Sequence, residues 1–237
     1  VKFGISPFGI WKSGYPEGVV GSSQYDELYA DAKLWLNKGW VDYFSPQLYW
    51  PINSQLQSFK DLLEWWQEEN TQNRHLWPGL NTVEVRAPNR ATEIVNQVKI
   101  TNEVLNKQSI GAVHYSVAGL MNSREMVSAL KNGPYKEKAL IPASPWMKVE
   151  ILTKPTLHIL NNNETIVANW LNKAPKNAFQ WVLYTQYDQE WRTEILNKDT
   201  FSKKIEKHKN GKSLKRVALK AIDRLGNESD FALEKIN

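Results

Sequence analysis

The chain has 237 residues, 41% of them hydrophobic and 11% aromatic, which is enough for one large or two modest globular domains. It contains no apolar run of roughly 18 residues or more, so no segment is expected to cross a membrane as a helix. Cysteine is absent, which excludes disulfides, thiolate metal sites and cysteine nucleophiles. The net charge is +5, and the excess of positive residues lies after residue 147.

Up to about residue 131 the sequence repeats one unit, an apolar strand-like run followed by an amphipathic helix. We expect strands to begin near Lys2, Val41, His75 and Gly111. We expect helices near 23–39, 55–70, 91–107 and 123–131. Such βα units can begin a doubly wound sheet or form half of an eight-stranded barrel, and periodicity alone does not choose between these folds.

The first predicted helix has the clearest signals at its ends. Ser23 can cap its start with Asp26 three residues on, and Gly39 can stop it. Its predicted apolar face consists of Tyr25, Leu28, Tyr29, Ala32, Trp35 and Leu36.

The strands are followed by aromatic residues and not by a glycine-rich phosphate loop. No G-x-G-x-x-G pattern follows the first strand, which disfavours a dinucleotide-binding fold. Phe8, Trp11, Tyr49, Trp50 and Trp77 stand there instead. Since barrel enzymes place their sites at the C-terminal ends of the strands, this cluster favours a carbohydrate-binding surface.

Beyond residue 132 prolines punctuate the chain, and we place a domain boundary at 147/148. Short alternating runs follow at 165–170, 179–184, 191–196 and 214–222, a pattern typical of an antiparallel β-sandwich. The basic stretch at 203–216 is interpreted as a solvated surface, because no base-stacking aromatic residues are interleaved with it. We therefore expect no nucleic-acid partner, and the alternative interpretation of this stretch is a patch for an anionic polymer.

Five ordered strings, VKFGISPFGIW, YADAKLWLNKGWVDYFSPQLYWPI, LWPGLN, GAVHYSV and ALIPASPW, resemble the glycosyl-hydrolase-like family 10. Members of this family include a bacterial glycosidase acting on denuded peptidoglycan. The closing AIDRLGNESDF resembles the last strand region of a fibronectin type III-like module that often follows this barrel.

The resemblance implies an α/β plus all-β fold. Residues 1–147 would form the second half, about four βα units, of a TIM (β/α)8 barrel, and residues 148–237 a small fibronectin type III-like sandwich. Val1 would lie near the fifth strand, so the N-terminal half of the barrel would be a required partner and would carry an acidic motif at the end of the fourth strand. The resemblance also implies a periplasmic or cell-envelope location, with a lipoprotein as one form.

Glycoside hydrolysis usually needs two carboxyl groups, one as the acid and one as nucleophile or base. Glu84, in the third βα loop, is our candidate catalytic residue, ahead of Glu17 in the first loop and Asp42 at a strand start. Histidine spacing supports no zinc site, and we expect neither metal nor cofactor. The residues predicted to contact substrate are Trp11, Gln47, Tyr49, Trp50, Trp77, Asn81, His114 and Ser116.

The sequence therefore predicts an O-glycosidase of bacterial cell-wall glycan, meaning peptidoglycan strands without peptides, or of a related polysaccharide. Paired carboxylates would do the chemistry, one of them outside this chain. The alternative is a barrel that binds glycan without cutting it, with the sandwich acting as a tether.

Overall fold

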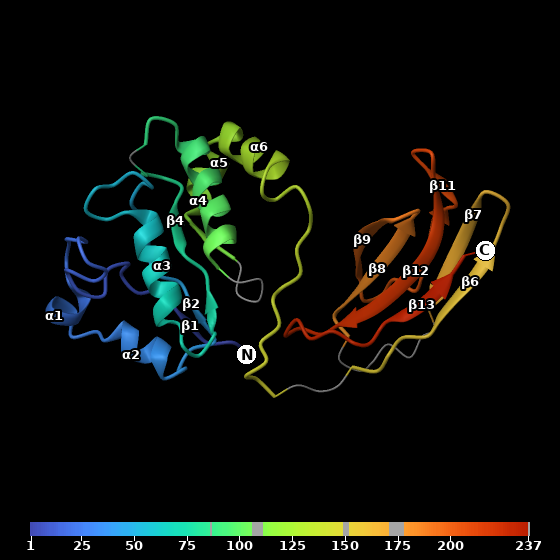
Figure 1. Cartoon of the computed structure of the whole chain (residues 1–237), viewed down its shortest axis with the longest axis horizontal. Coiled ribbons are helices and arrows are strands. Elements are labelled where there is room, and N and C mark those ends of the chain that lie inside the picture. Colours follow the sequence, from blue (N-terminus) through green and yellow to red (C-terminus); the bar gives the residue numbers. More distant parts are fainter. Residues whose placement is uncertain (86, 106–110, 149–151, 171–177, 237) are drawn as a thin grey trace. The chain divides into compact units, whose positions relative to one another are not determined.

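The computed structural model describes residues 1–85, 87–105, 111–148, 152–170 and 178–236. The chain forms two compact units, Val1–Lys138 (unit 1) and Ala139–Asn237 (unit 2), and each is described by itself (Figure 1). The two units divide ahead of the boundary predicted at 147/148. No helix in the described part of the chain has the length and apolar character needed to span a bilayer.

Unit 1 has short parallel strands that follow one another in chain order. One sheet has the order β1-β2-β3, and β4 pairs with β5 in a second sheet. Isolated parallel bridges join Gln47 to Phe8 on one side and to Gly79 on the other, so the ladder continues between the two sheets. The strands are β1 (Gly4–Ile5), β2 (Tyr43–Phe44), β3 (His75–Leu76), β4 (Gly79–Asn81) and β5 (Val113–Tyr115), close to the four predicted starts.

Three of the predicted helices are confirmed in position. They correspond to α3 (Phe59–Glu69), α4 (Arg90–Val104) and α6 (Arg124–Asn132), and a short α5 (Val117–Met121) precedes the last of them. Residues 106 and 107 of the third predicted helix lie outside the described residues.

The first predicted helix is wrong as a single element, because the structure breaks it into α1 (Gln24–Leu28) and α2 (Ala32–Asn37). Tyr29 adopts a left-handed conformation with φ 52° and is 92% exposed. The Ser23 hydroxyl accepts from the Asp26 backbone N–H, as predicted, but Asp31 caps a second start by accepting from Leu34. Consequently only the α2 part of the predicted apolar face is buried in the core, through Ala32 and Leu36.

The core of unit 1 lies between the strands and the long helices. Figure 1 shows α3 running alongside the strands. The fully buried side chains come from strand segments and helices alike, which is what a sheet covered by helices on one face requires. They include Phe44, Leu48, Phe59, Leu62, Leu63, Trp66, Leu76, Leu80 and Ile94.

Unit 2 is a sandwich of two antiparallel sheets. One has the order β10-β7-β6, and the other, five-stranded, has β11-β12-β8-β9 with β13 paired to β12. Trp170 of β7 and Trp181 of β8 meet in the shared core with ring centroids 6.2 Å apart. The strands are β6 (Leu157–Asn161), β7 (Thr165–Trp170), β8 (Gln180–Tyr187), β9 (Glu190–Asn197), β10 (Ser202–Glu206), β11 (His208–Lys209), β12 (Lys212–Ile222) and β13 (Ala232–Lys235).

The four predicted runs of unit 2 correspond to β7, β8, β9 and β12, whereas β6, β10, β11 and β13 were not predicted. Strand β10 reads SKKIE and has one buried apolar residue, Ile205, so its alternation is too weak to stand out.

The string AIDRLGNESDF forms the turn that follows β12. The Asp223 carboxylate accepts from the backbone N–H groups of Leu225 and Asn227, each at 2.8 Å, and from the Asn227 side chain. Gly226 has φ +86° and packs its Cα against the backbone at Ile141. The string therefore corresponds to a turn of the sandwich that the Asp223 carboxylate stabilises.

Candidate functional site

The strands of unit 1 have one face under the helices and one face open. Gly4, Tyr43 and His75 lie in register across β1, β2 and β3, while the next residues, Phe44 and Leu76, are fully buried under the helices. Because side chains alternate along a strand, Tyr43 and His75 belong to the opposite face, which we call the open face because no helix covers it, although His75 itself is only 1% exposed. This open face is where the predicted site residues have to be sought.

Near the start of the strands, the open face carries an aromatic stack. The Trp77 ring lies 5.1 Å from Tyr43 and 5.1 Å from His75, with interplanar angles of 25° and 8°. The Trp77 indole Nε1 is buried and has no hydrogen-bond partner in the described structure. Gly111 approaches the same indole so closely that a Cβ there would lie 2.5 Å from it. Trp77 is thus packed into the N-terminal part of the open face.

At the C-terminal ends of the strands the open face carries two stacked tyrosines. Tyr49 and Tyr115 have ring centroids 5.3 Å apart at 23°, and we call them the tyrosine pair. Asn81 lies directly opposite Tyr115 in the β4–β5 register. Burial, with the neighbouring Tyr115, raises the pKa of Tyr49, so its hydroxyl stays protonated and can donate. Tyr115 is 55% exposed, which leaves a ring face open to a ligand.

Gln47 lies on the same strand segment as Tyr49, two residues earlier. Its side-chain amide donates to the Ser6 carbonyl at 3.0 Å, so its position is fixed by the neighbouring strand. The structure therefore brings together Gln47, Tyr49 and Asn81 of the predicted substrate contacts at adjacent strand ends.

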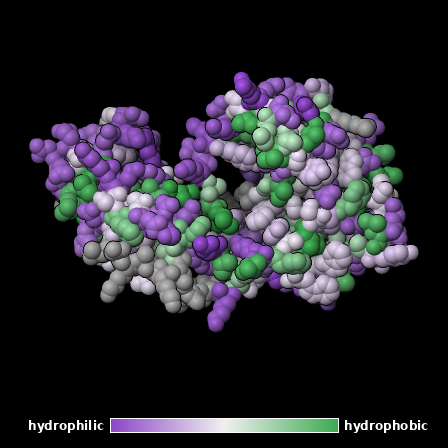
Figure 2. Space-filling view, turned by 180° about the vertical axis from the view of Figure 1, so that it is seen from behind, coloured by the Kyte–Doolittle hydropathy of each residue, from purple (hydrophilic) through white to green (hydrophobic). Residues whose placement is uncertain are grey.

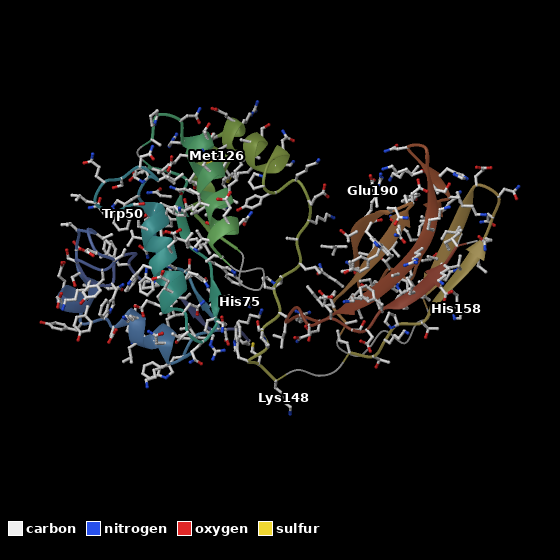
Figure 3. The ribbon with its side chains drawn as sticks, in the orientation of Figure 1. Trp50, His75, Met126, Lys148, His158 and Glu190 are labelled. Carbon is white, nitrogen blue, oxygen red and sulfur yellow. The ribbon has the colours of Figure 1, made fainter. Side chains whose placement is uncertain are left out.

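Trp50 and Trp11 lie elsewhere and serve as packing residues in this structure. Trp50 meets Phe8 edge-on at 5.6 Å, and its carbonyl accepts from Gln97. Figure 3 shows Trp50 apart from His75. Trp11 stacks on Trp65 of α3 at 6.0 Å and donates its indole N–H to Asp31 at 3.0 Å.

Glu84 lies in the exposed turn that follows β4. Its backbone N–H donates to the Asn81 side-chain oxygen at 2.9 Å, and the N–H of Val83 donates to the same atom at 3.1 Å. The Arg90 guanidinium fixes the turn further through a hydrogen bond to the Val83 carbonyl. Asn81 therefore holds the loop that carries Glu84, while the Glu84 side chain remains exposed.

His114 and Ser116 do not join the tyrosine pair. His114 lies opposite the fully buried Leu80, on the helix-covered face, and its Nε2 is hydrogen-bonded to the Tyr135 hydroxyl at 2.7 Å. Its Nδ1 is buried without a partner in the described structure. Ser116 is the N-cap residue of α5, and its carbonyl accepts from the Thr82 hydroxyl at 2.8 Å.

The environment of His114 predicts a loss of stability in acid. Burial lowers the pKa of His114, so the unfolded chain binds a proton that the folded chain resists. Stability should therefore fall as the pH drops below about 6.5, the usual value of an unfolded histidine. Urea unfolding followed from about pH 7.5 to 5 checks this. The His114→Gln variant should lose less stability over the same range, and equal losses would show that another group is responsible.

Sequence reasoning missed Tyr115, the partner of Tyr49. The available signal was alternation: His114 and Tyr115 are neighbours on a strand and must point to opposite faces. Only the register of β5 against β4, which pairs His114 with Leu80 and Tyr115 with Asn81, decides which of them is on the open face. In the described residues no group of three or more histidine, aspartate or glutamate side chains could hold a metal ion.

Unit 1 is thus a mixed α/β unit whose open strand face ends in aromatic and amide side chains. Residues 1–96 match the family described as Glycosyl hydrolase-like 10, which confirms the resemblance seen in the sequence.

Two curated relatives are named as glycosyl hydrolases. Glycosyl hydrolase YngK of Bacillus subtilis (strain 168) is 30% identical over 211 residues, covering 81% of this chain and 41% of YngK. Glycosyl hydrolase DigH of Escherichia coli (strain K12) is 41% identical over 70 residues, covering 28% of this chain and 16% of DigH. The chain therefore spans less than half the length of these relatives.

Among solved structures, an FN3 domain of human collagen XX aligns with 41% of this chain and 100% of its own, at 18% identity and a TM-score of 0.31. A beta-1,2-glucanase from Parabacteroides distasonis aligns with 37% of this chain and 13% of its own, at 17% identity and a TM-score of 0.30. Both likenesses are too slight to add to the argument.

Proposed function

We propose that unit 1 forms the aromatic and polar part of the substrate cleft of a glycoside hydrolase acting on bacterial cell-wall glycan, meaning peptidoglycan strands without peptides, or on a related polysaccharide. The observation that carries the proposal is the tyrosine pair, Tyr49 and Tyr115, at the C-terminal ends of parallel strands. Aromatic rings expose an apolar face on which a sugar ring can stack, and Asn81 and Gln47 nearby offer amide groups for its hydroxyls. The family match and the names of the curated relatives support the same class of reaction.

The proposed fold of the whole site is a barrel of which unit 1 is the second half. Its strands are parallel and follow chain order, as barrel strands do. In this arrangement Glu84 supplies one carboxyl group from its loop, and the partner half supplies the other. Glu84 would act as the acid that protonates the leaving oxygen or as the base that activates water.

The test is product release from peptide-free peptidoglycan strands, measured by mass spectrometry with the protein containing both proposed halves. Glu84→Gln keeps the size of the side chain but cannot exchange a proton, so the rate should fall by about 10²- to 10⁴-fold. Glu103→Gln, an exposed glutamate on α4, is the matched control and should cleave normally. Full activity of Glu84→Gln would remove Glu84 from the mechanism.

A glycan-binding protein without cleavage is the second candidate function. It is favoured by one observation: the Glu84 carboxylate is exposed and has no hydrogen bond or ion pair among the described residues. Retention of the protein on the same strands without any product, lost in Tyr115→Ala, would support the binding function in place of the enzyme.

A further inference from the structure

We propose that the outer face of the five-stranded sheet in unit 2 is a second glycan-binding site, specific for a carboxylate-bearing glycan strand. This site is separate from the proposed cleft of unit 1 and does not depend on cleavage there. It is built from the exposed side chains of Lys235, Arg216 and Trp191, with the largely buried Gln186 (8% exposed) between them, and we call these four residues the Trp191 row.

The strand register places these four side chains in one line. Arg216 of β12 lies opposite Lys235 of β13 and opposite Gln186 of β8, and Gln186 lies opposite Trp191 of β9. The next residue along β12, Val217, is fully buried in the sandwich core. Because neighbours on a strand point to opposite faces, the Trp191 row lies on the outer face.

Trp191 is packed over only part of its surface. It lies on β9, which ends the sheet, and it is 46% exposed. It makes no ring contact with any described residue. In Figure 3 the neighbouring Glu190 marks the start of this strand. A flat indole held open on a sheet is suited to stacking against the apolar face of a sugar ring.

The two cations of the row have no carboxylate partner of their own. Three lysines on these sheets do have one, since Lys212 pairs with Glu190, Lys203 with Glu194 and Lys220 with Glu228, whereas Lys204, Lys209 and Lys215 form no ion pair within the described residues. Arg216 and Lys235 form no ion pair within the described residues, although they lie directly opposite each other. Like charges directly opposite in a sheet destabilise it, so an anion placed between them would relieve the repulsion.

Both features fit one ligand. Adjacent strands are about 4.8 Å apart, so Arg216 lies roughly 10 Å and Lys235 roughly 14 Å from Trp191 along the row. If one sugar ring of the glycan stacks on Trp191, the following sugars can extend across Gln186 to the two cations. There the Arg216 guanidinium can bind a carboxylate of the glycan with two hydrogen bonds. Figure 2 shows hydrophilic residues over much of the visible surface of unit 2, with hydrophobic residues in small groups between them.

The test is calorimetric titration of the whole chain with two matched sugars. A hyaluronan hexasaccharide alternates N-acetylglucosamine with glucuronate, whereas chitohexaose consists of N-acetylglucosamine alone and is uncharged. We expect hyaluronan to bind at least about tenfold more tightly, because its carboxylates can form charge-assisted hydrogen bonds with Arg216 and Lys235 and chitohexaose cannot. The affinity should also fall as salt is added, because the contacts are exposed.

Variants locate the site. Trp191→Ala should weaken binding of both sugars, and Arg216→Gln with Lys235→Gln should remove the preference for hyaluronan. Matched controls are Trp40→Ala, an exposed tryptophan of unit 1, and Lys204→Gln, an exposed lysine of β10, and both should bind as the parent does. Trp191→Tyr keeps an aromatic face and should retain most of the affinity, which separates stacking from misfolding.

Three results would overturn the proposal. These are equal affinity for the two sugars, unchanged binding in the Trp191 and Arg216 variants, and equally tight binding of oligo-dT that is lost in the same variants. The last result would mean a site for any polyanion. Product release from peptidoglycan strands is a separate measurement, so failure of the proposed cleavage leaves this result readable.

Discussion

Replacing Trp66 by alanine is expected to lower the free energy of unfolding of unit 1 by about 3–5 kcal/mol, the usual range for removing a buried tryptophan. Trp66 is fully buried on α3 and packs on Phe44 of β2 at 4.8 Å. Its indole N–H also donates to the Gly9 carbonyl at 2.8 Å, across 57 residues of chain. One side chain therefore links a helix, a strand and the segment after β1.

Chemical denaturation followed by circular dichroism measures this effect, because removal of a tryptophan complicates fluorescence. The free energy of unfolding of Trp66→Phe should lie between the values for Trp66→Ala and the parent. Phenylalanine keeps most of the packing but leaves the buried Gly9 carbonyl without its donor. Trp40→Ala is the control: Trp40 is 62% exposed, and the change should stay within about 0.5 kcal/mol. A loss at Trp66 no larger than that at Trp40 would show that the contacts of Trp66 do not stabilise unit 1.

Gly226→Ala is expected to be the most damaging small substitution in unit 2, costing about 2 kcal/mol or more. A Cβ at this position would lie 2.4 Å from the Ile141 carbonyl oxygen and 2.8 Å from the backbone of Pro142. The positive φ of +86° adds a conformational cost of about 1–2 kcal/mol for any L-residue.

Gly211→Ala separates the two contributions. Gly211 also has a positive φ, +75°, but nothing lies within 4 Å of an added Cβ. The midpoints of thermal unfolding of unit 2 are compared for Gly226→Ala and Gly211→Ala. Their difference measures how much the contact between the 223–229 turn and the 141–142 segment stabilises unit 2. If both alanine variants unfold at the same temperature, that contact carries no stability.

Much of the architecture could be predicted because it depends on local patterns. The 3.6-residue period of α3, with Phe59, Leu62 and Trp66 buried, is visible in the sequence and confirmed in the structure. The break in the first helix could have been anticipated, because Asp31 is a second capping residue close behind Ser23. Two caps in so short a stretch indicate two helices.

The site was harder to predict because it depends on long-range register. Trp11 follows a strand, as a substrate contact would, yet its loop carries it onto Trp65 of α3. The choice between His114 and Tyr115 rests on a three-residue strand, too short for its own pattern to show which face is covered. The neighbourhood of Trp191 and Arg216 likewise depends on pairing between β8, β9 and β12, and no aromatic residue interrupts the basic stretch itself.

The hydrogen bond between His114 and Tyr135 and the close approach of Gly226 to Ile141 have a joint consequence for the connection between the two units. The first fixes the chain to unit 1 at residue 135, where the Lys136 backbone N–H also donates to the Gly133 carbonyl, and the second fixes it to unit 2 from residue 141. Only residues 137–140 lie between these two points, and four extended residues reach at most roughly 14 Å.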